Sequence, residues 1–238
     1  MNQHPSFKSI RPMSDYTRIG SFYPGPGHPF AADLQAKAND YSRQKKSYYF
    51  VKRGIDIVAS LILVTGVLSW LVPVVALIIK LDSGGAVFFR QKRVGKCGRH
   101  FICYKFRTMR FNADADVKPA VKNDPRITRA GRWLRYSNID ELPQLINVLA
   151  GEMSLVGPRP HMPADCARFA ALIPDYASRH RVKPGITGLA QVKGYHGPAP
   201  DYESILRRYH WDALYVRNAG IWLDIRIMAG TITRRLIL

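Results

Sequence analysis

The amino-acid sequence predicts an α/β fold: a monotopic membrane protein with a re-entrant N-terminal membrane helix and a compact cytoplasmic domain of amphipathic helices and a small sheet. Three observations predict it. Residues 57–79 are apolar and uncharged, two β-rich runs follow over 86–95 and 101–109, and much of the remaining chain shows helical periodicity. We therefore divide the chain into a mobile tail over 1–47, the membrane helix over 48–82 and the cytoplasmic domain over 83–238.

The chain is strongly basic, with 36 Lys and Arg residues against 17 Asp and Glu and a formal net charge of +19. Such a surplus indicates polyanionic partners: nucleic acid, anionic lipid headgroups or phosphorylated substrates. The three cysteines, Cys97, Cys103 and Cys166, are odd in number and lack C-x-x-C spacing, which argues against a disulfide framework and a structural zinc site. We expect reduced, half-buried thiols.

The N-terminal residues 1–47 contain clusters of proline and glycine and no sustained apolar period, which is typical of a mobile tail. The apolar run that follows is long enough to cross a bilayer. Both of its flanks are basic, however, with Lys52 and Arg53 before it and Lys80 after it, whereas a spanning helix carries its positive flank on one side. Gly66 and Pro73 interrupt the middle, where a helix can bend. These features favour a hairpin-like re-entrant helix.

The two β-rich runs are separated by a turn at residues 95–98, which predicts a β-hairpin. In the second run, alternation puts Ile102 and Tyr104 on one face and Lys105 and Arg107 on the other. The basic face is either a solvated strand surface or part of a binding site. The pattern alone does not choose between them.

A short amphipathic helix is predicted downstream of the hairpin, because Leu142, Leu145, Ile146 and Leu149 have the spacing of one buried helix face. Ser137, three residues before Asp140, has the form of a capping box, and Pro143 is compatible with the first helical turn.

Asp140 and Glu141 would then lie at the helix N-terminus, where the helix dipole stabilises anions. Helix capping alone accounts for both carboxylates; an ionised carboxylate is also a nucleophile or a metal ligand. Arg159 follows between Pro158 and Pro160. This arrangement suits a fixed guanidinium that clamps a phosphate.

These residues carry a resemblance. The run over 139–160, with its Asp140-Glu141 pair and its Gly157-Pro158-Arg159-Pro160 turn, resembles the signature of the bacterial sugar transferases, which are monotopic polyprenyl-phosphate phosphoglycosyl transferases. The resemblance extends from about Lys52 to near the C-terminus. It implies transfer of a sugar-1-phosphate, glucose or galactose, from a UDP-sugar to undecaprenyl phosphate with release of UMP. That reaction starts exopolysaccharide or capsule synthesis through a covalent aspartyl phosphosugar intermediate.

The resemblance also implies roles for individual residues. Asp140 and Glu141 would be catalytic, with Asp140 as nucleophile, and both would bind Mg²⁺. Lys105, Arg135, Arg159 and Asp212 would bind substrate or phosphate. Taken alone, Arg135 is a surface cation near the membrane and Asp212 is an acid on a helix surface.

The implied location is the cytoplasmic face of the bacterial inner membrane, with the helix entering from that face and turning back. Trp70 stands where the family has the proline of its Ser-Pro turn, and the nearest proline is Pro73. Near the C-terminus an apolar helical stripe begins at Ile221. It fits either an ordinary core helix or a helix lying in the headgroup plane.

The expected partners are a UDP-sugar, undecaprenyl phosphate and inner-membrane lipids, with no nucleic acid; the sequence leaves a homodimer open. Three alternatives remain at this stage. One is the same reaction with an N-acetylated amino sugar in glycoconjugate assembly. The second is a basic, membrane-associated nucleic-acid-binding protein, although the sequence has no helix-turn-helix, zinc-finger or RNP motif. The third is a noncatalytic membrane scaffold.

Overall fold

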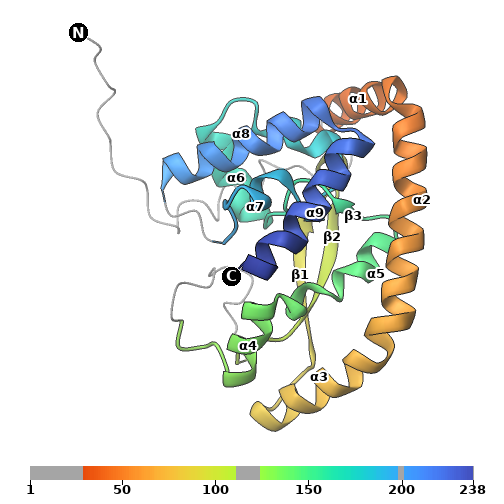
Figure 1. The fold of residues 1–238 in the computed structure, drawn as a ribbon. Helices are drawn as coiled ribbons and strands as arrows, with labels where there is room; N and C mark the ends of the chain where they lie inside the picture. Colours follow the sequence, from red (N-terminus) through yellow and green to blue (C-terminus); the bar gives the residue numbers. More distant parts are fainter. Residues whose placement is uncertain (1–28, 111–123, 198–200, 238) are drawn as a thin grey trace.

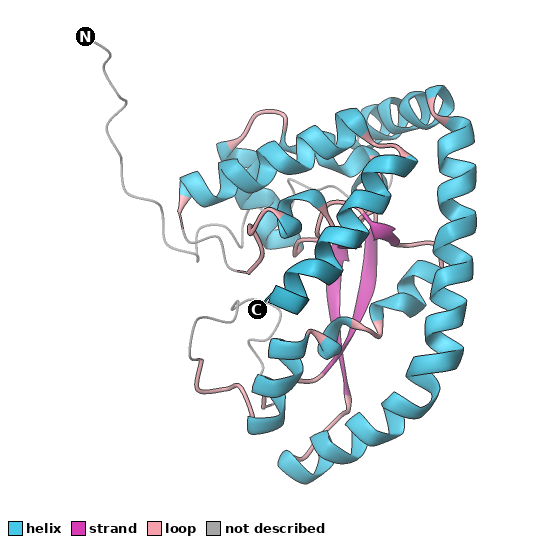
Figure 2. Cartoon of the chain, viewed as in Figure 1, coloured by secondary structure: helices cyan, strands magenta, loops and turns pink. Residues whose placement is uncertain are grey.

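A long bent helix runs along one side of a domain built around a two-stranded sheet (Figures 1 and 2). The computed structural model describes residues 29–110, 124–197 and 201–237. In this part of the chain, shorter helices surround the sheet, and the long helix arches around them. The mixture of helices and small sheets is consistent with the predicted α/β class.

Helix α1 (Pro29–Gln44) corrects the expectation of a mobile tail over 1–47. Its residues Leu34 and Ala38 are buried, and the Tyr41 hydroxyl donates a hydrogen bond to the carbonyl oxygen of Val216. The segment forms a helix because residues 29–44 lack internal glycine and bury one apolar side against the C-terminal half of the chain. Residues 1–28 lie outside the described residues.

The predicted membrane helix is one continuous element with a bend. It consists of α2 (Lys46–Leu63), a π-helical turn (Val64–Leu68) and α3 (Ser69–Asp82). At the turn the Ser69 N–H bonds to the carbonyl of Val64, five residues back, and the Thr65 hydroxyl donates to the carbonyl of Leu61. A π-turn with side-chain hydrogen bonds is a recognised cause of a helix kink. The chain thus bends as an arch, not as a tight hairpin, and the bend begins before Pro73.

The two faces of this helix differ. The inner face of α3 enters the main hydrophobic core, where Leu71, Val75 and Ile79 pack with Phe106 and Leu134. The outer face is apolar and exposed; large examples are Phe50, Val58, Leu61, Ile62, Trp70, Leu77 and Leu81. By length and composition the helix from Lys46 to Asp82 is able to cross a membrane. An apolar face with no protein partner is the face that lipid would cover.

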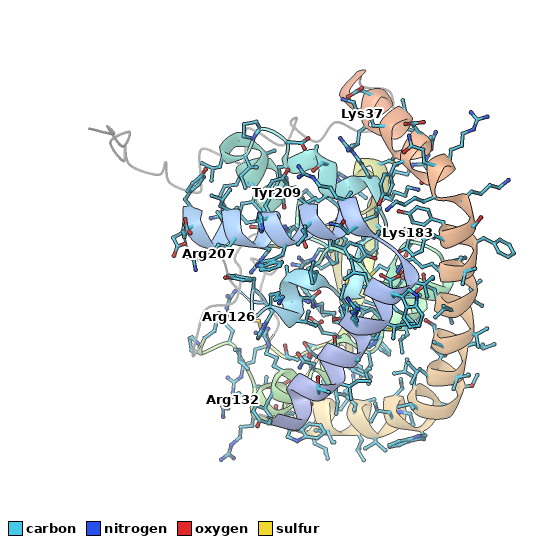
Figure 3. All side chains as sticks on the ribbon, turned by 45° about the horizontal axis from the view of Figure 1, so that its top comes forward. Lys37, Arg126, Arg132, Lys183, Arg207 and Tyr209 are labelled. Carbon is cyan, nitrogen blue, oxygen red and sulfur yellow. The ribbon has the colours of Figure 1, made fainter. Side chains whose placement is uncertain are left out.

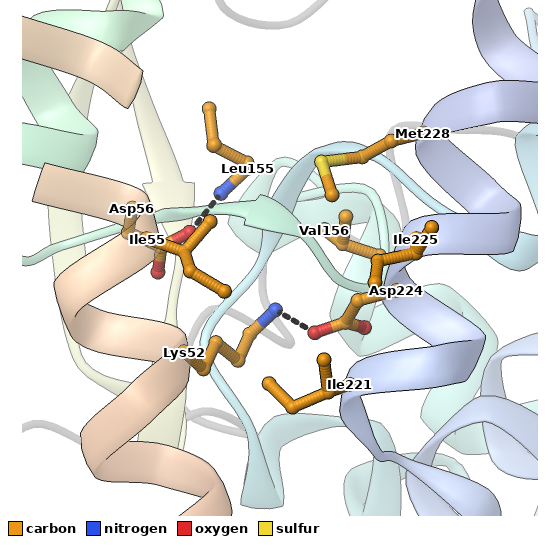
Figure 4. A pocket seen from close by; sticks show the side chains of 9 residues that line it. All are labelled: Lys52, Ile55, Asp56, Leu155, Val156, Ile221, Asp224, Ile225 and Met228. Carbon is orange, nitrogen blue, oxygen red and sulfur yellow. Dashed lines mark hydrogen bonds and ion pairs between the residues drawn. The ribbon is translucent and has the colours of Figure 1, made fainter. Parts of the chain in front are cut away.

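Buried polar contacts join the N-terminal half of α2 to the domain (Figure 4). The Lys52 ammonium lies 2.6 Å from the carboxylate of Asp224 on α9 (Ile221–Ile237). Asp56 accepts hydrogen bonds from the Ser154 hydroxyl and the Leu155 N–H, both at 3.0 Å. Lys52 is thus paired within the protein. Lys52 belongs to the basic flank that the sequence analysis used to place the helix in a membrane. This residue of the flank therefore binds a carboxylate within the protein.

The predicted hairpin is confirmed as strands β1 (Phe88–Val94) and β2 (His100–Phe106), which are antiparallel and joined by a turn at Lys96–Gly98. Phe101 and Cys103 are buried, and Lys105 shares their face. The solvated-face interpretation of the basic side is therefore wrong, because Ile102 is the exposed residue. Arg107, just beyond the strand, is buried and donates to the carbonyls of Ser83 and Gly84.

Two further short strands, β3 (Ser154–Val156) and β4 (Gly185–Thr187), pair in parallel. Gly157 follows β3, and a side chain there would overlap the backbone of Lys183 and Gly185. The remaining described helices are α4 (Arg129–Ser137), α5 (Gln144–Leu149), α6 (Pro163–Leu172), α7 (Leu189–Val192) and α8 (Tyr202–Asn218), with a 3₁₀ segment at Tyr176–Arg181.

The C-terminal helix α9 buries a different face from the one its apolar stripe indicates. Asp224 and Ile227 point inward, whereas Trp222, Ile225 and Ile232 are 77%, 42% and 62% exposed. The core-helix interpretation of the stripe holds only in part: Met228 packs against the core beside Ile227, while those three residues are exposed. Its exposed apolar residues suit the alternative, a helix at a membrane interface.

Basic side chains are spread over several elements: Lys37 lies on α1, Arg132 on α4 and Arg207 on α8 (Figure 3). Lys37 and Arg207 pair with carboxylates one helical turn away, at 2.8 and 2.7 Å. Such exposed pairs contribute little to stability. They also reduce the free positive charge that a nucleic acid would meet on these helices.

Close packing at Gly131 provides a test of this fold. A Cβ atom there would lie 2.0 Å from the carbonyl oxygen of Thr108, so Gly131→Ala forces α4 away from the end of the hairpin. We expect this substitution to lower the free energy of unfolding by roughly 1–3 kcal/mol. The measurement is denaturant unfolding in detergent.

Gly54→Ala is the matched control, because nothing lies within 4 Å of its added Cβ. Inside helix α2 it should raise stability by roughly 0.5–1 kcal/mol through lower backbone entropy. Equal stabilities of the two variants would contradict the close approach of α4.

Candidate active site

The adjacent carboxylates Asp140 and Glu141 lie in a 3₁₀ turn (Ile139–Glu141) between α4 and α5. The capping box predicted from Ser137 is wrong. Ser137 ends α4, and its hydroxyl donates to the carbonyls of Trp133 and Leu134. Asn138 then takes a left-handed conformation with φ of 54°, which ends α4 and turns the chain toward the dyad.

Helix α5 buries Leu145 and Val148, while Ile146, assigned to the buried face from its spacing, is exposed. Ile146 is exposed because α5 contacts the hairpin through a polar side chain, that of Asn147. The Asn147 side-chain oxygen accepts from the Tyr104 N–H at 3.1 Å, and its amide donates to the Ile102 carbonyl at 2.7 Å. Asn147 thereby fixes α5 against β2, next to Lys105.

Glu141 is held by two cations. Its side chain is 14% exposed, and its Oε1 lies 2.6 Å from both the Lys105 ammonium and the Arg159 guanidinium. A second bond of 3.1 Å from Arg159 to Oε2 makes that contact bidentate. Burial alone would raise the pKa of Glu141, but Arg159 and Lys105 outweigh it and hold that pKa well below its usual range. Three of the predicted site residues are thus brought together.

Asp140 has a different environment from its neighbour. It is buried, and among the described residues no hydrogen bond or ion pair engages its carboxylate. Burial, reinforced by the charge of Glu141, raises the pKa of Asp140 to about 6. Burial thus outweighs the stabilisation of the anion that is expected at a helix N-terminus. At neutral pH the group is still mostly ionised, and it is free to react.

Arg135 lies on the last turn of α4, and its Nε donates to the Thr108 hydroxyl at 2.7 Å. Burial lowers the pKa of Arg135, and the charge of Asp140 partly offsets this effect. The guanidinium thus acts on Asp140 through electrostatics.

Asp212 lies behind the dyad. The structure pairs it with Arg179 at 2.8 Å, and both side chains are almost fully buried, so the surface-acid interpretation of Asp212 is wrong. Arg179 in turn donates to the backbone carbonyl of Arg159 at 2.6 Å. Asp212 therefore supports the Arg159 loop through Arg179. Sequence reasoning missed Arg179, since no spacing links it to a residue 33 positions away.

A small cavity of about 10 Å³ lies beside the dyad, lined by Arg93, Cys103, Lys105, Gln144, Arg159 and Pro160. Sequence reasoning did not select Arg93 or Gln144. The register of the hairpin pairs Arg93 with Phe101, so Arg93 shares the inner face with Lys105. All three cysteines are buried and free, which confirms reduced thiols, although they are more deeply buried than expected.

Most of the chain resembles one known family of proteins. Residues 47–237 match the profile of the family described as bacterial sugar transferase. A UDP-glucose:undecaprenyl-phosphate glucose-1-phosphate transferase of Xanthomonas campestris pv. campestris is 44% identical over 80% of this chain and 40% of its own length. A UDP-N-acetylgalactosamine-undecaprenyl-phosphate N-acetylgalactosaminephosphotransferase of Aeromonas hydrophila is 45% identical over 78% of this chain and 43% of its length.

Those two relatives are much longer than this chain, which spans about two fifths of each. The exopolysaccharide production protein PSS of Rhizobium leguminosarum bv. phaseoli is closer in size, since it is 47% identical over 78% of this chain and 95% of its own length. The family match extends from the start of α2 through α9 and includes the dyad, the hairpin and the Arg159 loop. The chain therefore belongs to the bacterial sugar transferase family.

Proposed function

We propose that this chain transfers a sugar-1-phosphate from a UDP-sugar to undecaprenyl phosphate and releases UMP, as the first step of exopolysaccharide or capsule synthesis. The observation that carries the proposal is the unpaired, buried carboxylate of Asp140 beside fixed cations. The family membership and the names of the Xanthomonas and Rhizobium relatives support it. A nucleic-acid-binding role would leave this arrangement unused.

The reaction proceeds in two displacements. Asp140 attacks the β-phosphorus of the UDP-sugar, the bond from that phosphorus to the bridging oxygen breaks, and UMP leaves with the electron pair. A phosphate oxygen of undecaprenyl phosphate then attacks the phosphosugar, which frees Asp140. Two steps allow one small site to accept a soluble donor and a lipid acceptor in turn.

The cations of the site make the first step feasible. A carboxylate that approaches a diphosphate is repelled, so positive charge must lie on the phosphate oxygens. Arg159 and Lys105, which both contact Oε1 of Glu141, supply it, and Arg135 adds a third charge that acts on Asp140. Arg179 and Asp212 hold the Arg159 backbone in position.

We also propose that Asp140 and Glu141 hold Mg²⁺ together with the donor. Among the described residues, no group of three or more His, Cys, Asp or Glu side chains forms a protein cage for a metal. Two carboxylates nevertheless suit Mg²⁺, which usually takes one or two from the protein and completes its shell with phosphates and water. Bound there, the ion would neutralise charge on the phosphate oxygens.

Glucose is our preferred sugar, with galactose next; an N-acetylated amino sugar is the alternative. The Xanthomonas relative is named for glucose and the Aeromonas relative for N-acetylgalactosamine, at nearly equal identity to this chain. Overall similarity therefore separates these sugars poorly, and a direct measurement is needed.

The first prediction concerns the covalent intermediate. Incubation with UDP-glucose and no acceptor should release about one equivalent of UMP per enzyme and add a phosphosugar to Asp140, because the second displacement lacks its nucleophile. Intact mass and peptide mapping measure the adduct, and a panel of UDP-sugars identifies the donor. Asp140→Asn should form none. Full turnover by that variant, or kinetics that require donor and acceptor to bind together, would refute the mechanism.

The second prediction concerns pH. Because the pKa of Asp140 is raised to about 6, the UMP burst should fall as pH decreases through about 6, where the nucleophile becomes protonated. Glu141 remains ionised there, since its pKa is held low. Measuring the burst without acceptor avoids titration of the acceptor phosphate, whose pKa is also near 6. A burst that stays constant down to pH 4 would contradict the assigned environment of Asp140.

The third prediction concerns the membrane. We propose that both ends of the helix from Lys46 to Asp82 lie on the cytoplasmic face of the inner membrane. Two features support this: one domain packs against α2 and α3 alike, and the exposed outer face is apolar. Single cysteines at Ser47 and Ser83 in a cysteine-free background should react alike with an impermeant thiol reagent, only after the membrane is opened. Labelling of one end from the periplasm would indicate a spanning helix.

A further inference from the structure

We propose that Gln144 and Arg93, together with Lys105 and Arg159, form a pocket for a single phosphoryl oxygen of the nucleoside diphosphate donor. This inference rests on the proposed function and assigns two further residues to the donor site. The oxygen would be a non-bridging atom of the diphosphate, held while Asp140 faces the β-phosphorus.

The cavity beside the dyad has the size that this role requires. Its volume of about 10 Å³ has room for one oxygen atom. It is lined mainly by groups that donate hydrogen bonds: the guanidinium groups of Arg93 and Arg159, the ammonium of Lys105 and the amide of Gln144. Such a lining favours an atom that accepts several hydrogen bonds, as a phosphoryl oxygen does.

Two of these donors lack an acceptor in the structure. The Gln144 side chain is 2% exposed, and its Nε2 has no hydrogen-bond partner among the described residues. The Nε of Arg93 is likewise buried without one. A buried donor without a partner is rare in native proteins and calls for an unseen acceptor. Two of them beside one cavity indicate a common acceptor.

Arg93 is fixed by its other nitrogens. One donates to the Pro160 carbonyl at 3.0 Å and another to the Gln91 side-chain oxygen. The guanidinium therefore joins β1 to the loop that carries Arg159. These bonds leave Nε as the guanidinium nitrogen of Arg93 that has no hydrogen-bond partner among the described residues.

Three of the residues that line the cavity are cations. Arg93, Lys105 and Arg159 bring three positive charges to the cavity, and the carboxylate bonded to two of them is Glu141. The thiol of Cys103 stays neutral, because burial raises its pKa.

Two substitutions of Gln144 test whether the cavity holds a phosphoryl oxygen or a structural water. Gln144→Glu places a carboxylate among the three cations, in the position of the phosphoryl oxygen. We expect an unchanged or higher melting temperature in detergent, together with UDP binding weakened by at least about tenfold, since the new charge repels the ligand. Gln144→Leu removes only the amide donor and should weaken UDP binding by about three- to tenfold. The readouts are the UDP-induced shift in melting temperature and KM for the donor.

Gln44→Glu on α1 is the matched control, because it adds the same charge at an exposed position. It should leave UDP binding and KM unchanged. If both Gln144 variants bind UDP like the wild type and only lose thermal stability, the cavity holds a structural water and the inference is wrong. If Gln144→Glu does not fold, Gln144→Leu decides by the same two readouts.

Failure of the proposed function has a different signature. In that case the wild-type protein releases no UMP from any UDP-sugar and shows no shift in melting temperature with UDP. Wild-type turnover combined with normal UDP binding by the Gln144 variants would refute the oxygen pocket alone.

Discussion

The paired contact of Glu141 with Lys105 and Arg159 is the interaction on which the site depends. It joins β2, the turn at Ile139–Glu141 and the loop after β3 at one point. A buried carboxylate is unfavourable without such partners, so the three elements are constrained to meet. Glu141 takes both cations, whereas no hydrogen bond or ion pair with the described residues engages the Asp140 carboxylate. The two cations lower the pKa of Glu141, and burial raises that of Asp140. Two neighbouring carboxylates whose pKa values are shifted in opposite directions can take different roles.

A second layer of buried polar contacts keeps this point rigid. Asp212 holds Arg179, which holds the Arg159 backbone, and Asn147 fixes α5 against β2. These residues come from α8, the Tyr176–Arg181 segment and α5, which are far apart in the chain. Positioning of the reacting groups is thus distributed over the domain. Such support keeps the side chains of the candidate site in one geometry.

The long helix is part of the same body as the site. Its α3 half shares one hydrophobic core with Phe106, Leu134 and Leu145, and Leu145 belongs to the helix that follows the dyad. The α2 half is joined through Lys52 and Asp56. The turn that carries Asp140 and Glu141 therefore packs directly against the inner face of the long helix. The dyad turn and the long helix thus share one hydrophobic core.

The sequence by itself predicted the long helix, the hairpin and the position of a candidate site. The apolar run over 57–79 predicted the long helix, the glycine-rich turn predicted the hairpin, and the Asp140-Glu141 pair with Arg159 located the site, because each signal is local in the chain. Tertiary structure decided which strand face turns inward, that Ser137 ends a helix instead of capping one, and that Asp212 and Gln144 are buried. It also decided which carboxylate stays free. These outcomes depend on pairings between residues distant in sequence, such as Lys105 with Glu141 and Arg179 with Asp212, and hydrophobic periodicity carries no information about such partners.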